Sequence, residues 1–178
     1  MEQLIMNWTR GSAAEPLEVA LPEGFSFRRF DGSAADIDAW LEIVQHGLTD
    51  GKGDRTVFRR IMEECPGYDP EGICFIEKNG APCATASVFC DFTKRHGYVH
   101  MVCAAPWARG YGIGTALARL AVNELLERGM ETAHLTTDDF RLPGAVFGPK
   151  GLAVRQLKRH ASWVQNVVRQ FGPYLLRA

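Results

Sequence analysis

The sequence predicts an α/β fold with a mixed, mostly antiparallel central sheet that is flanked by helices. Two apolar runs at 73–78 and 84–92 are joined through Asn79-Gly80, a dipeptide typical of a tight antiparallel hairpin. A strand, a glycine-rich turn, a long helix and another strand follow over residues 98–136. Antiparallel strands followed by one strand–helix–strand unit exclude an all-parallel sheet.

Before the hairpin, the chain predicts one strand and two helices. Residues 1–24 are expected to form an irregular lead-in, because glycine, proline and small residues interrupt them. Phe25–Phe30 is rich in aromatic residues and predicts the first strand of a single domain that runs from residue 25 to residue 178. Ser33 and Asp54 have side chains that cap helix N-termini, and apolar residues at helical spacing follow both. The glycine-containing segment 46–54 between them predicts a loop.

After the hairpin, proline and glycine mark the ends of elements: Pro106 closes a strand, and Gly129 follows a helix at the position where glycine is favoured. The expected elements are a strand at 98–104, a helix at 112–128, a strand at 132–136, a short helix at 142–150 and a C-terminal amphipathic helix at 161–171. The apolar stripe of that last helix, around Trp163, suits either a core position or a homodimer contact.

Composition excludes several classes of protein. The 178 residues are 46% hydrophobic and 23% charged, which fits a globular domain with a sizeable core. A formal net charge of -1 argues against a nucleic-acid partner. The chain has no apolar run that could span a membrane and no signal-peptide pattern, so we expect a cytoplasmic protein without a membrane partner. The five cysteines are odd in number and form no Cys-x-x-Cys pair, which favours reduced core thiols.

The turn at 109–114, with the sequence Arg-Gly-Tyr-Gly-Ile-Gly, carries most of the functional information. Successive backbone N–H groups at such a turn, together with the positive end of a helix dipole, form an anion site. Glycine lets the backbone approach a phosphate closely, and Arg109 adds a fixed positive charge. A dinucleotide-binding turn is disfavoured, because Thr115 or Leu117 occupies the position of its third glycine. A tight turn without a ligand is the remaining alternative.

Arg109-x-x-Gly112-x-Gly114, preceded by Pro106 and an apolar strand, resembles the acetyl-CoA signature of the GNAT N-acetyltransferase superfamily. The order of elements from about Phe25 to Leu152 is also similar to that of the family. The resemblance implies a splayed sheet with acetyl-CoA between the strands at 98–104 and 132–136. Backbone groups of two strand residues would bind the pantetheine arm, and the turn would bind the pyrophosphate. The cofactor-binding residues it implies are Cys103, Ala104, Arg109, Gly110, Tyr111, Gly112, Ile113, Gly114 and Thr115.

Acyl transfer from a thioester to an amine needs a base for the amine, donors for the oxyanion and help for the departing sulfur. We predict His100 as the base, because an imidazole titrates in the useful range. Strand alternation would place His100, Val102 and Ala104 on one face. Asp138 is a second catalytic prediction, since it follows the next strand and could bind a cationic amine or relay its proton. Structural roles, as a buried histidine or a turn carboxylate, are the alternatives.

Relatives in the family carry a tyrosine four residues before a Gly-Phe pair, and that tyrosine protonates the sulfur. Here Gly151-Leu152 fits the pair and places Phe147 at the tyrosine position. Cys90, His96 and His100 match no zinc spacing, so no metal is expected. The resulting prediction is an acyltransferase that moves an acetyl group from acetyl-CoA to a primary amine of a small molecule. A non-catalytic acyl-CoA-binding sensor and a protein N-acetyltransferase are the alternatives.

Overall fold

The computed structural model describes residues 3–11 and 15–138. Their strands form one six-stranded sheet in the order β1-β6-β5-β4-β3-β2, and only the β5–β6 pair is parallel. This confirms the mixed, mostly antiparallel sheet. The strands are β1 (Gln3–Thr9), β2 (Phe25–Arg29), β3 (Ile73–Lys78), β4 (Ala81–Asp91), β5 (His96–Ala104) and β6 (Thr132–Asp138).

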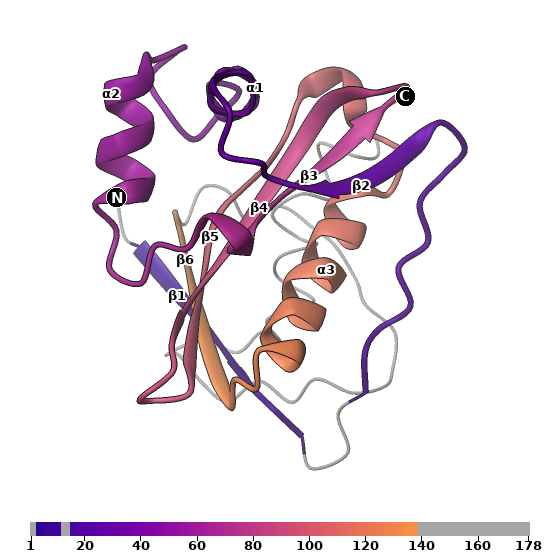
Figure 1. Ribbon diagram of the computed structural model, residues 1–178. Helices are drawn as coiled ribbons and strands as arrows, with labels where there is room; N and C mark the ends of the chain where they lie inside the picture. Colours follow the sequence, from indigo (N-terminus) through magenta and orange to yellow (C-terminus); the bar gives the residue numbers. More distant parts are fainter. Residues whose placement is uncertain (1–2, 12–14, 139–178) are drawn as a thin grey trace.

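Helices cover both faces of the sheet (Figure 1). The helical segments are α1 (Ala34–Val44), α2 (Arg55–Phe58), a π-helical turn (Arg59–Glu63), 3-10 turns at Pro70–Gly72 and Pro106–Ala108, and α3 (Ile113–Glu127). Buried apolar side chains form two clusters, one on each face. One cluster joins α3 to the sheet through residues such as Leu117 and Val122, and the other joins α1 and α2 through Trp40 and Phe58. No helix in these ranges is long and apolar enough to cross a membrane.

Most local signals are confirmed. The Ser33 hydroxyl accepts a hydrogen bond from the Asp36 amide at the start of α1, and the Asp54 carboxylate accepts one from the Thr56 amide at the start of α2. Asn79 and Gly80 join β3 to β4 with positive φ angles of 52° and 80°, as a tight hairpin requires. None of the five cysteines, all of which lie in the described ranges, forms a disulfide, and four of them are buried. The helices expected at 142–150 and 161–171 lie outside the described residues.

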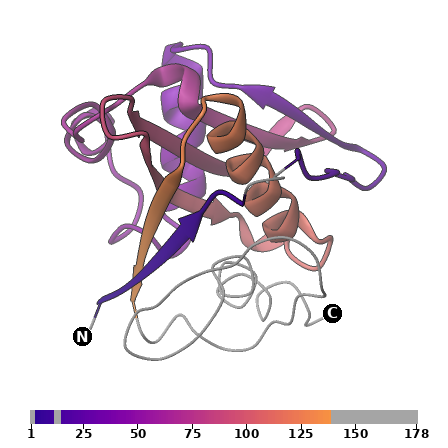
Figure 2. The same cartoon turned by 90° about the horizontal axis from the view of Figure 1, so that it is seen from below.

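The expectation of an irregular lead-in over residues 1–24 is wrong for Gln3–Thr9, which forms β1. This strand pairs antiparallel with β6, and Trp8, opposite Ala133, is only 1% exposed. In Figure 2 the indigo strand β1 lies along the orange strand β6 at the edge of the sheet. The partner lies far along the chain, so local sequence gives little sign of the pairing.

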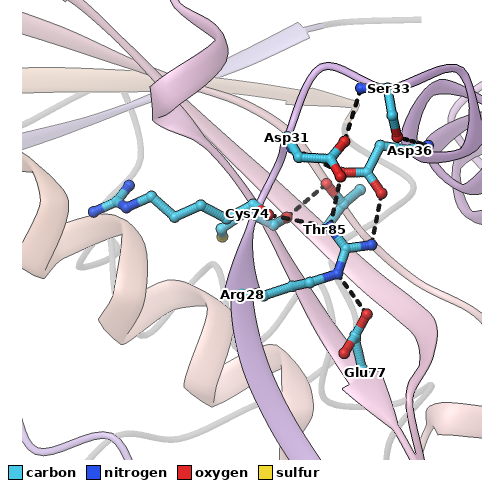
Figure 3. Close-up of polar contacts among 8 residues, drawn as sticks. Arg28, Asp31, Ser33, Asp36, Cys74, Glu77 and Thr85 are labelled. Atoms are coloured by element: carbon cyan, nitrogen blue, oxygen red, sulfur yellow. Dashed lines mark hydrogen bonds and ion pairs between the residues drawn. The ribbon is translucent and has the colours of Figure 1, made fainter.

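An ion-pair network fixes β2 to α1 (Figure 3). The Arg28 guanidinium donates two hydrogen bonds to the Asp36 carboxylate, at 2.7 and 2.6 Å, and one to Glu77 of β3 at 2.5 Å. Asp36 also accepts a bond from the Asp31 amide, and the whole residue is 3% exposed. Such bidentate, charge-assisted bonds are geometrically specific, so they set where the first helix lies against the sheet.

Candidate active site

The parallel strands β5 and β6 separate partway along their length. Their register pairs are His96–Thr132, Gly97–Ala133 and Tyr98–His134, and no further pair follows although both strands continue. On its other side β5 stays paired with β4 as far as Cys103 and Ala104. The two strands therefore diverge towards their carboxyl ends. This is the splayed arrangement that the sequence resemblance implied, and Cys103 and Ala104 lie on its β5 side.

A β-bulge interrupts β5 within this opening. The register with β4 shifts between Thr85 and Ser87, and Met101 has a positive φ of 51°. A bulge inserts one residue and reverses the side-chain alternation beyond it. The prediction that His100, Val102 and Ala104 share a face is therefore wrong. His100 contacts Ile61 of the π-helical turn that follows α2, whereas Val102 and Ala104 belong to the core under α3.

The glycine-rich turn lies at the N-terminus of α3. Gly110 and Gly112 have positive φ angles of 86° and 77°, so the backbone adopts conformations that a side chain disfavours. Residues 110–112 are exposed, and within the described ranges the amides from Gly110 to Gly114 have no hydrogen-bond acceptor. The Thr115 amide, by contrast, donates to the Gly112 carbonyl at 3.0 Å. The anion site predicted from sequence thus retains its amides from 110 to 114, while that of Thr115 is already bonded.

Two cations border this turn. Arg109 is half-buried, and its guanidinium donates to the His46 carbonyl at 3.4 Å, which fixes the loop before α2 against the turn. Lys78 of β3 places its ammonium 4.0 Å from the ring centroid of Tyr111, which also packs against Phe25 at 5.2 Å. Sequence reasoning missed Lys78, because only the sheet brings it to the turn. A run of amides without acceptors, exposed at residues 110–112 and lying between two cations, suits a phosphate or pyrophosphate.

His100 is held by both of its ring nitrogens. Nε2 lies 3.2 Å from the Ile61 carbonyl oxygen, and Nδ1 lies 2.9 Å from the Tyr98 hydroxyl oxygen. A carbonyl only accepts, so Nε2 carries the hydrogen in the neutral ring and Nδ1 accepts from Tyr98. Burial lowers the pKa of His100, and the bond to Ile61 acts in the opposite direction. The imidazole is therefore neutral at pH 7 and can accept a proton only at Nδ1.

Tyr98 is part of a column of stacked rings where the strands begin to separate. Its ring lies 4.6 Å from that of His134 and 4.9 Å from that of His100, and His96 stacks on His134 at 5.0 Å. His96 Nε2 and His134 Nδ1 lie 2.7 Å apart, and burial, with the nearby His96, lowers the pKa of His134. Sequence reasoning did not single out Tyr98, although this residue lies two positions before His100 on a predicted strand, a spacing that places both on one face.

No described contact links the remaining residues singled out from the sequence, Asp138 and Phe147, to the opening between β5 and β6. Asp138 is the last residue of β6, opposite Gln3, and its side chain lies outside the described part, as does Phe147. Between 3 and 138, the described residues contain no group of three His, Cys, Asp or Glu side chains that could hold a metal ion. A cavity between α3 and β2–β4 is lined by residues such as Phe27 and Glu124 and by none of the predicted site residues.

Comparison with known proteins agrees with this geometry. Residues 37–145 match the family model described as "Acetyltransferase (GNAT) family". The mycothiol acetyltransferase of Streptomyces bingchenggensis is 30% identical over 138 residues, which cover 75% of this chain and 44% of that protein. That of Pseudarthrobacter chlorophenolicus is 32% identical over 151 residues, covering 78% and 45%. The chain thus spans about half the length of the curated relatives it matches.

Among solved structures, a GCN5-related N-acetyltransferase from Sphaerobacter thermophilus superposes with a TM-score of 0.66 at 19% identity, over 86% of this chain and 48% of that chain. This likeness supports the fold alone. The family match covers more than half of the chain, and it falls on the elements that form the turn and the opening. The chain therefore belongs to the acetyltransferase (GNAT) family.

Proposed function

We propose that this protein transfers an acetyl group from acetyl-CoA to a primary amine of a small molecule. The main support is the combination of family membership with the backbone amides of residues 110–114 at the N-terminus of α3, which donate to no acceptor among the described residues. These amides would bind the pyrophosphate, with Arg109 and Lys78 adding positive charge. The pantetheine arm would lie between β5 and β6, beside Cys103 and Ala104, which directs the thioester towards the point where the strands separate.

The acceptor amine would attack the thioester carbonyl from the side of α1 and α2, where His100 lies. The attack forms a C–N bond and an oxyanion, and backbone N–H groups near the end of β5 would stabilise this charge. The C–S bond then breaks, and the sulfur leaves as a thiolate. Because a free thiol has a pKa of about 8.5, the sulfur can leave near neutral pH with modest help. The nitrogen loses its proton, for which His100 is the proposed acceptor.

The curated relatives are called mycothiol acetyltransferases, which favours a small molecule over a protein as the acceptor. Asp138, at the end of β6, is retained as a proposed contact for a cationic amine. We further propose that the protein acts in the cytoplasm. A homodimer is proposed on the basis of the helical spacing of apolar residues in the sequence at 161–171.

The proposal is tested by incubating the protein with acetyl-CoA and a panel of acceptors, while free thiol release and thermal stability are both recorded. The panel contains the unacetylated amine form of mycothiol, glucosamine, spermidine and a peptide with a free N-terminus. Saturating CoA should raise the melting temperature, because a ligand that binds only the native state stabilises it. One small amine should accelerate thiol release over the acetyl-CoA blank.

Each negative result has its own meaning. If CoA does not stabilise the protein, the binding site at the turn is refuted. Stabilisation without amine-dependent thiol release would favour an acyl-CoA-binding sensor. Turnover of the peptide alone would favour a protein N-acetyltransferase.

A further inference from the structure

The Tyr98 hydroxyl lies where β5 and β6 begin to diverge. Tyr98 and His134 form the last register pair between these strands, and the hydroxyl reaches forward to residues two positions further along each strand. It lies 2.9 Å from His100 Nδ1 on β5 and 3.4 Å from Thr136 Oγ1 on β6. The phenol therefore points in the direction in which the opening widens, with its oxygen at the narrow end.

The hydrogen-bond capacity of this hydroxyl leaves room for one more donor. Its single hydrogen goes to His100 Nδ1, since the bond to Ile61 places the ring hydrogen on Nε2. One lone pair faces the Thr136 hydroxyl, and the second can accept a hydrogen bond from a ligand. His100, in contrast, has both nitrogens engaged, so an acceptor amine in the opening meets the tyrosine oxygen first.

The ring of Tyr98 is also fixed in place. It is stacked on His134 with an interplanar angle of 13°, it packs against the tilted ring of His100 at 37°, and the residue is half-buried. The neighbouring groups on every packed element are defined: His134 and Thr136 on β6, Phe89 on β4 and the carbonyl of Ile61 in the π-helical turn. No carboxylate is among these contacts, and His134 packs on the ring face, so His100 Nδ1 is the basic nitrogen that is hydrogen-bonded to the phenol.

We infer that the Tyr98 hydroxyl takes the proton from the acceptor nitrogen and passes its own proton to His100. This rests on the proposed acetyltransferase function. As the C–N bond forms, the positively charged nitrogen of the adduct gives one proton to the Tyr98 oxygen. The original phenol proton moves to His100 Nδ1, which becomes an imidazolium that still donates from Nε2 to the Ile61 carbonyl. The C–S electron pair leaves with the thiolate, which takes a proton from water, and His100 returns its proton through Tyr98 to solvent.

The test compares Tyr98→Phe with Tyr68→Phe, its matched control. Tyr68 packs against Phe89, as His100 does, yet no hydrogen bond joins it to His100 among the contacts that the structure describes. With the best amine of the panel, Tyr98→Phe should lower kcat at pH 7 about 100-fold. KM for acetyl-CoA should stay unchanged. The deficit should shrink at pH 9–10, where hydroxide can take the proton directly. Tyr68→Phe should keep the wild-type kcat.

A double variant tests whether the two residues act as a unit. The variants Tyr98→Phe, His100→Gln and the double variant should have similar rates, because removing either partner interrupts the same transfer. Nitrogen NMR gives a readout that needs no acceptor: His100 should be the neutral Nε2–H tautomer at pH 7, and its Nδ1 resonance should shift in Tyr98→Phe. Near-wild-type kcat in Tyr98→Phe, multiplicative losses, or an Nδ1–H tautomer would overturn the inference alone. No turnover by the wild-type protein would overturn the proposed function as well.

Discussion

Replacing Gly112 with alanine separates the conformational role of this glycine from its role towards a ligand. Gly112 has a φ of +77°, and an added Cβ would meet no atom of the described residues within 4 Å. The variant therefore creates no clash in the free protein, and its effect on folding is the left-handed backbone conformation, about 1 kcal/mol. The same Cβ would occupy space beside the amides of residues 110–114, where the proposed pyrophosphate would approach.

Gly129 gives a matched control at the other end of α3. Its φ is +73°, and within residues 3–11 and 15–138 no atom lies within 4 Å of an added Cβ. Both Gly112→Ala and Gly129→Ala should lower the free energy of unfolding by about 1 kcal/mol in urea titrations without ligand. Only Gly112→Ala should weaken CoA binding. Loss of one hydrogen bond to a charged oxygen, about 1.5–3 kcal/mol, corresponds to a roughly 10- to 150-fold higher Kd in calorimetry.

Two outcomes would refute this reasoning. If the two variants bind CoA equally well, the pyrophosphate does not contact the turn at 110–114. If Gly112→Ala unfolds far more easily than Gly129→Ala, the turn has a structural role that the open space around Gly112 does not suggest, and its loss of CoA binding would carry no information about the ligand.

Three further predictions concern stability. Asp36→Asn, which weakens the ion pair with Arg28, should lower the free energy of unfolding by about 2–3 kcal/mol, a loss between those typical of exposed and of buried ion pairs. Asp38→Asn, in the exposed pair with Arg55, should lower it by less than about 1 kcal/mol. Equal losses in the two variants would contradict the structural role of the Arg28 network. Ser87→Ala should not destabilise the protein, because the buried Ser87 hydroxyl has no hydrogen-bond partner among the described residues. If chemical denaturation showed a loss of more than about 1 kcal/mol in the free energy of unfolding, this hydroxyl would have a hydrogen-bond partner after all. The pKa of His100 is lower in the folded protein than its ordinary value of 6.5, so as pH falls the unfolded chain binds a proton at His100 before the folded protein does. The free energy of unfolding of the wild-type protein should therefore drop more between pH 7 and pH 5 than that of His100→Gln. Parallel curves of this free energy against pH would contradict the prediction.

The parts of the fold with local signals could be predicted from the sequence. The Asn79-Gly80 hairpin, the capped starts of α1 and α2 and the glycine turn before α3 each depend on residues within a few positions of one another. β1 could not be predicted in this way, because its partner β6 begins more than a hundred residues later and Trp8 gains its burial only from that pairing. Local propensity carries no information about such a contact.

The same limit applies to the candidate site. The turn at 109–115 was visible as a pattern, but the bulge at Met101 was not, because Met is not a residue that marks a left-handed conformation. Strict alternation therefore assigned His100 to the wrong set of neighbours. The bonds that define its chemistry come from Tyr98 and from the backbone of Ile61, and the second of these depends on how α2 and the turn after it pack against the sheet.

The short pairing between β5 and β6 has a consequence for local unfolding. Three residue pairs join the β1–β6 ribbon to the rest of the sheet, whereas β1 and β6 pair along their whole length. Such a ribbon is suited to opening as one cooperative unit at a lower free energy than global unfolding. A ligand lying between β5 and β6 would connect the two parts, so its occupancy should appear as slower amide hydrogen exchange throughout β1 and β6, including residues far from any ligand atom. Exchange in β3 should change only to the extent that the whole protein becomes more stable.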